Sequence, residues 1–159
     1  MFGTMAFFCT LNKYLMFILS LFEFMSAYNW WTNSKQEIAA TEGLISPMRG
    51  AGTELFVVVF ALYLVTLGLT RLNVFLQPTS RPTLFIAIVV HIFEQGFWWF
   101  EALQPQYAKG ATAQEIVKDV LEMKRGLFLS LVLLVPGLIV VLNLLAFLTA
   151  PSPIVTVKA

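Results

Sequence analysis

Three ionisable residues lie near the middle of long apolar stretches of the sequence: Glu23, His91 and Glu94. An ionisable side chain inside an apolar span is costly to bury, which makes each of them a candidate functional residue. His91 and Glu94 are three residues apart and share one face of a helix, where they could relay a proton or hold the polar head of a quinone or lipid. They could instead form a hydrogen-bonded lock between helices, and this is the interpretation we favour.

Other common site chemistries lack their residues in this sequence. The one cysteine excludes a disulfide within the chain, and the one histidine cannot supply the two axial imidazoles of a membrane b-type haem. Neither a Gly-rich phosphate loop nor a Gly-x-Ser-x-Gly elbow occurs. We therefore expect no catalytic residue, no metal and no cofactor, although a phospholipid could be bound. A net charge of +1 gives no field that would attract nucleic acid.

The composition of the chain is that of a membrane protein. Of its 159 residues, 58% are apolar and 12% are charged, and a chain of this length cannot bury so much apolar surface within itself. A helix that crosses the hydrocarbon needs about 20 predominantly apolar residues. Four stretches meet this test, at about 13–31, 54–76, 82–103 and 126–149. We predict an all-α fold over residues 1–159, with about four transmembrane helices forming a single domain.

A short amphipathic helix is predicted before the last span, over about 112–125. Thr112 and Glu115 have the spacing of a capping box, which favours a helix start. The apolar face of this helix consists of Ile116, Val117, Val120 and Leu121. Such a helix is expected to lie at the membrane interface, or against a partner subunit. A short tail follows the last span, over 150–159.

Polar residues recur on the second and third predicted spans at alternating steps of three and four, the spacing of a helix-packing seam. On the third span the seam is Leu84, Ala87, His91, Glu94, Trp98 and Glu101. On the second span it is Tyr63, Thr66, Thr70 and Asn73. We expect these two seams to meet across the short turn between the spans, with Glu23 approaching from the first span.

Two arginines and four tryptophans are candidates for contact with lipid headgroups. They are Arg71, Arg81, Trp30, Trp31, Trp98 and Trp99. Tryptophan prefers the headgroup level of a membrane. Arg71 lies about a turn and a half inside the end of the second span, from where its long side chain could snorkel to the surface.

These features predict a non-catalytic accessory subunit of a multi-subunit membrane complex, with other membrane subunits and lipids as partners. Fifteen phenylalanines and four tryptophans offer broad packing faces, and the loops are too small for a soluble active domain. The favoured host is a respiratory-chain or ATP-synthase complex of the mitochondrial inner membrane, with the endoplasmic reticulum and thylakoid as alternatives. Two other classes stay open: a small lipid-, sterol- or quinone-binding protein or scaffold with a His/Glu pocket, and an ion or proton pathway.

Overall fold

The computed structural model describes residues 2–35, 54–107, 109–122 and 127–151, and within these ranges it is all-helical. The helices are α1 (Phe2–Thr32), α3 (Glu54–Leu76), α4 (Arg81–Tyr107), α5 (Ala113–Leu121) and α6 (Leu127–Thr149). No strand occurs among the described residues. The prediction of an all-α fold is confirmed.

Three of the helices are long and apolar enough to cross a membrane, over Phe7–Thr32, Val57–Leu76 and Arg81–Phe100. A shorter apolar segment, Leu133–Thr149, lies in α6. These lengths and the composition are consistent with an integral membrane protein.

The helix bounds lie close to the predicted ones except at the start of α1. This helix begins at Phe2, whereas the predicted first span begins at about Lys13. The charge of Lys13 is accommodated within the α1–α3 pair, because its Nζ lies 5.2 Å from the centroid of the Phe75 ring on α3. The predicted tail falls mostly on residues outside the described ranges.

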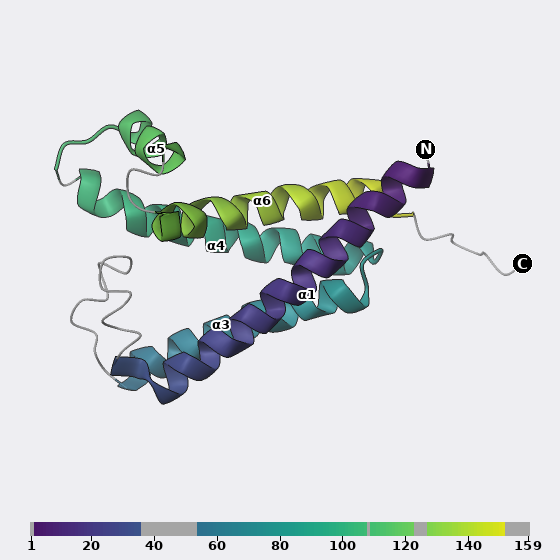
Figure 1. Ribbon diagram of the computed structural model, residues 1–159, viewed down its shortest axis with the longest axis horizontal. Helices are drawn as coiled ribbons and strands as arrows, with labels where there is room; N and C mark the ends of the chain where they lie inside the picture. The colour runs from purple at the N-terminus through teal and green to yellow at the C-terminus, as the bar shows by residue number, and fades with distance from the viewer. Residues whose placement is uncertain (1, 36–53, 108, 123–126, 152–159) are drawn as a thin grey trace, which may run out of the picture.

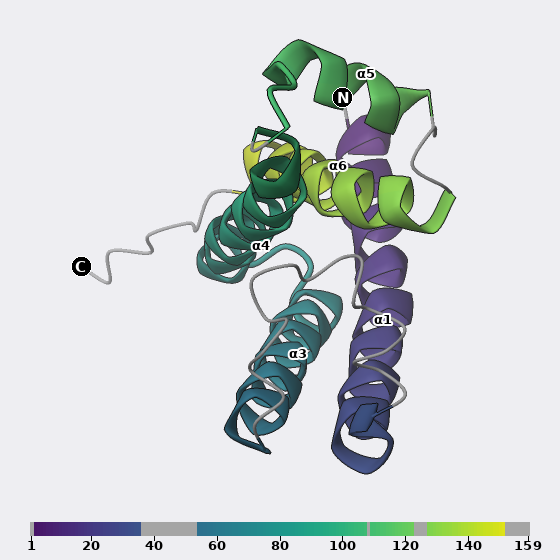
Figure 2. The same cartoon turned by 90° about the vertical axis from the view of Figure 1, so that its left-hand side faces the viewer.

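The four long helices form two antiparallel pairs, α1 with α3 and α4 with α6 (Figure 1). The two pairs lie close together at the end where α3 turns into α4, and they diverge toward the opposite end (Figures 1 and 2). Near its N-terminus α1 also contacts α6.

Each pair buries seams of residues spaced by three or four, as in helix bundles. The buried seam of α1 consists of Cys9, Asn12, Met16, Ser20, Glu23, Ala27 and Trp30. The buried seam of α3 includes Phe60, Leu64, Leu67, Arg71 and Val74. Leu84, Ala87, His91 and Glu94 of the predicted seam on α4 are also buried. The seams thus carry charged groups into the packed interior.

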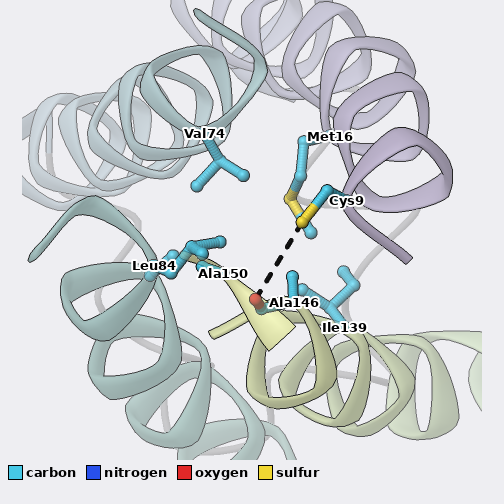
Figure 3. Close-up of a cluster of buried hydrophobic side chains, with 8 residues drawn as sticks. Cys9, Met16, Val74, Leu84, Ile139, Ala146 and Ala150 are labelled. Atoms are coloured by element: carbon cyan, nitrogen blue, oxygen red, sulfur yellow. Dashed lines mark hydrogen bonds between the residues drawn. The ribbon is translucent and has the colours of Figure 1, made fainter. Parts of the chain in front are cut away.

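Two apolar clusters lie above and below these charged groups along the helices. The first brings together side chains of all four long helices and the residue that follows α6 (Figure 3). It includes Cys9, whose Sγ donates to the Ala146 carbonyl at 4.0 Å. The second joins α1 and α3 through Trp30 and Phe60, and Trp98 of α4 packs against it. The charged seam residues occupy the level between the two clusters.

The capping box of α5 is confirmed. The backbone N–H of Thr112 donates to the Glu115 carboxylate at 2.8 Å, and the Thr112 hydroxyl accepts from the Glu115 N–H at 3.3 Å. Helix α5 packs on α4 and α6 through Ile116 and Val120, which are fully buried.

The proline inside α6 does not end the helix, which continues through Pro136 to Thr149. Proline removes the helical hydrogen bond to the carbonyl four residues earlier, that of Val132, and its ring crowds that turn of the helix. Gln95 of α4 donates from Nε2 to the Leu133 carbonyl at 2.7 Å. Gly137 leaves room for this contact, because a Cβ there would lie 3.2 Å from Gln95 Oε1. This contact joins α4 to the turn of α6 that precedes Pro136.

Candidate functional site

The charged seam residues meet around the guanidinium of Arg71, in what we call the Arg71 cluster. It consists of Glu23 from α1, Arg71 from α3, and His91 and Glu94 from α4. Arg71 is 2% exposed and His91 0%. The cluster is therefore closed to solvent, and it links the α1–α3 pair to α4.

Each of the three nitrogen atoms of the guanidinium donates to a protein group. Nη2 bonds both oxygens of Glu94, at 3.1 and 3.0 Å, and Nε donates to Nε2 of His91 at 3.1 Å. Nη1 donates to Oε1 of Glu23, with which it also forms an ion pair. Charge-assisted bonds of this kind are stronger than neutral ones, and arginine with its rigid fork suits several acceptors at once.

The tautomer of His91 follows from its two partners. Its Nδ1 lies 2.6 Å from the Ala87 carbonyl, which can only accept, so Nδ1 carries the proton. Its Nε2 faces an N–H of Arg71 and must therefore be the acceptor. A neutral imidazole satisfies both bonds. A proton on Nε2 would oppose the guanidinium N–H, so relaying a proton through this ring requires breaking its bond to Arg71.

Sequence reasoning placed Glu23, His91 and Glu94 at one level, and the structure brings all three together. The expected contact of Arg71 with lipid headgroups is wrong, because the side chain points into the bundle. Two carboxylates and an imidazole lie within hydrogen-bonding reach, and a guanidinium in apolar surroundings is stabilised most by such partners. The signal was present in the sequence: Arg71 continues the seam of Leu64 and Leu67 at steps of three and four.

The predicted seam on α3 is correct at Tyr63, whose ring centroid lies 6.4 Å from that of Phe97 on α4, but wrong beyond it, at Thr66, Thr70 and Asn73. Thr66 and Asn73 are exposed, and the buried seam passes through Arg71. The hydroxyls of Thr66 and Thr70 donate to carbonyls of their own helix, those of Leu62 and Thr66, at 2.9 Å each. A threonine hydroxyl can make its hydrogen bond within its own helix and still face outward. An arginine side chain has five N–H donors, and its own helix cannot supply acceptors for all of them.

Of the other residues predicted to contact lipid headgroups, some are buried in the structure and others are exposed. The Trp30 side chain does not face lipid, because it is buried on the α1 seam with its ring centroid 4.7 Å from that of Phe60. Trp31 beside it is exposed, while Trp98 and Trp99 are half-buried. Arg81 is half-buried and donates from Nε and Nη2 to the Ala150 carbonyl, at 3.3 and 3.1 Å. This arginine caps the end of α6.

A second polar contact joins α1 to α6 nearer the converging end of the bundle. Asn12 donates from Nδ2 to Oδ1 of Asn143 at 3.0 Å, and both side chains are fully buried. Asn143 in turn donates to the Ile139 carbonyl at 3.0 Å. Sequence reasoning missed this pair. Each asparagine lies at a seam position of its helix, and polar residues at such positions commonly pair between membrane helices.

Among the side chains that the structure describes, no group of three or more His, Cys, Asp or Glu residues could hold a metal ion. The chain matches no protein-family model, no curated protein and no solved structure. The fold and site therefore define a class only: an all-helical chain with three candidate membrane spans, whose buried ionisable groups bond to one another across three helices.

Proposed function

We propose that this chain is an integral membrane protein of four spans that acts as a non-catalytic accessory subunit of a larger membrane complex. The observation that carries the proposal is the Arg71 cluster. Its ionisable groups form hydrogen bonds with one another across α1, α3 and α4. Such bonds favour a structural role in holding the helices together. A catalytic or ligand-binding group has to present an atom to something other than its own fold.

The outer surface of the helices supports a membrane location. Large apolar side chains are exposed on all four long helices, among them Met25, Leu62, Phe93 and Leu138. So much exposed apolar surface requires a cover of lipid or of partner helices. With α6 as the fourth span, both ends of the described chain lie on one side of the membrane.

The Arg71 cluster supports a scaffold better than a lipid or quinone pocket. A headgroup would need free donors or acceptors, but each guanidinium nitrogen and both imidazole nitrogens already have protein partners. A mitochondrial inner-membrane complex as the host stays a prediction from the sequence alone.

Native mass spectrometry of the chain gently extracted from its own membrane tests the proposal. We expect the wild-type chain in a large assembly, and a smaller fraction assembled for His91→Ala combined with Glu94→Gln. Thr66→Ala is the matched control, because that hydroxyl bonds only its own helix and should leave assembly unchanged. A monomer that carries one lipid or quinone per chain would contradict the proposal in favour of a pocket.

A further inference from the structure

The apolar surface of α5 is wider than the part that the fold buries. Ile116 and Val120 face α4 and α6 and are fully buried. Val117 and Leu121 follow each of them by one residue, about 100° farther round the helix, and are 41% and 62% exposed. We call these two residues, with Ala113, the apolar flank of α5. The fold leaves this flank uncovered.

The apolar flank lines a shallow open hollow bordered by polar side chains. The hollow is formed by Ala113, Gln114, Val117, Lys118, Leu121 and Glu122. Lys118 and Glu122 lie on the far side of it and pair at 3.9 Å while staying largely in solvent. The helix thus separates an apolar side from a charged side, the pattern of helices that lie in a membrane surface.

The position of α5 fits such a surface. The helix lies across the direction of the long helices, beside the start of α6 (Figures 1 and 2). At that level α4 ends and α6 begins, so a bilayer around the spans would have its boundary there. A helix lying along this boundary could turn one flank to the hydrocarbon and the other to water.

We propose that the apolar flank of α5 contacts lipid, with Val117 and Leu121 inserted below the headgroups and Lys118 in the headgroup layer. This inference rests on the membrane location proposed above. Lipid is the occupant because α5 lies at the level where α4 ends and α6 begins (Figures 1 and 2). A stable protein interface covers about 800 Å² per partner, far more than two side chains of a nine-residue helix provide.

Quenching by lipid-borne groups tests the proposal in nanodiscs. The chain has one cysteine, Cys9, which is buried, so single cysteines on a Cys9→Ala background can carry a fluorophore at chosen positions. The test label is Leu121→Cys, with Val117→Cys as a second variant. Lys118→Cys on the charged side is the matched control. Phe93→Cys, at an outward position of α4 that is 75% exposed, shows whether the long helices lie in the bilayer.

We expect lipids that carry a nitroxide on the acyl chain just below the headgroups to cause a several-fold greater loss of fluorescence at Leu121 and Val117 than at Lys118, and nitroxides deeper in the acyl chain to quench Phe93. Quenching at Phe93 without quenching at Leu121 and Val117 would overturn the inference while leaving the membrane location intact. Shielding of Leu121 from lipid-borne and aqueous quenchers alike would show a protein surface over the flank, which also overturns it. Absence of quenching at Phe93 would instead contradict the proposed function.

Discussion

The Nε–H of Arg71 donates to Nε2 of His91 at 3.1 Å, so a residue near the end of α3 and one in the middle of α4 share a buried hydrogen bond. The remaining nitrogens of the same guanidinium bond Glu94 on α4 and Glu23 on α1. The contact links the two helix pairs at the level between the apolar clusters.

Arg71→Leu should lower the free energy of unfolding by about 3–5 kcal/mol, because it leaves two buried carboxyl groups without their counter-charge. Unfolding followed by circular dichroism in mild detergent measures this. Arg81→Leu is the control, since that arginine is half-buried and contacts a terminal carbonyl and the Phe147 ring, and the variant leaves no buried carboxylate without its partner. A variant as stable as the wild type would show that the Arg71 cluster does not hold the bundle together.

Replacing all the charged members of the cluster should be milder than removing Arg71 alone. In Arg71→Met with Glu23→Met and Glu94→Met no buried charge is left unpaired, and apolar side chains can take the place of an ion-pair network at little net cost. We expect the triple variant to recover part of the stability lost in Arg71→Leu, because the buried Nε2 of His91 still lacks a donor. If it also assembles with its partners, the cluster has a structural role; failure to recover would mean that the polar contacts themselves are required.

The helices could be predicted from the sequence because each follows from local composition. Long apolar runs bounded by Pro78, Pro82 and the capping-box residues give the bounds of α3, α4 and α5 within a few residues. The seam on α4 could be predicted too, since His91 and Glu94 interrupt an otherwise apolar run at seam spacing.

The partner of those residues could not be predicted in the same way. Which face of α3 turns inward depends on the neighbouring helices, and α3 offers polar residues on two faces. Arg71 takes the inner face because its charge needs the carboxylates on α1 and α4, whereas Thr66 and Thr70 satisfy themselves within α3. The Asn12–Asn143 pair joins residues 131 apart in sequence, so the spacing within one helix carries no sign of it.

Two glycines give a matched pair of predictions for packing. A Cβ at Gly68 of α3 would lie 2.8 Å from the Phe24 ring of α1, whereas a Cβ at Gly96 of α4 would meet nothing within 4 Å. Gly68→Ala should destabilise the fold by about 1–3 kcal/mol through overpacking. Gly96→Ala should be neutral or stabilising, by up to about 1 kcal/mol, because alanine favours a helix.

Thermal unfolding of both alanine variants measures the difference. Adding Phe24→Leu to Gly68→Ala should recover part of the loss, because the smaller side chain frees the space. Equal stability of the two single variants would contradict the close packing of α1 against α3.

The stability of the first turn of α5 should depend on pH. Hydrogen bonds from the backbone N–H and then the hydroxyl of Thr112 lower the pKa of Glu115 from its ordinary value of 4.5. A carboxyl group with a lowered pKa in the folded state stabilises that state above its ordinary pKa, and the contribution is lost as the pH falls through the lower value. Amide hydrogen exchange at the start of α5 should therefore quicken below pH 4.5 beyond its intrinsic trend.

Glu115→Gln provides the control for this pH dependence. Glutamine can keep the capping box but does not titrate, so protection of α5 should no longer change with pH through this group. An unchanged pH profile in the variant would assign the effect to another residue.

The distance between the two helix pairs shows whether the Arg71 cluster holds them together. Nitroxides at Leu62→Cys on α3 and Leu138→Cys on α6, both outward positions, can be measured by pulsed electron paramagnetic resonance on a Cys9→Ala background. Labels at Tyr28→Cys and Leu62→Cys report the distance within the α1–α3 pair. We predict a single narrow distance between the pairs, which broadens or shifts in Arg71→Leu while the distance within the pair stays the same. Identical distributions between the pairs with and without Arg71 would contradict the account.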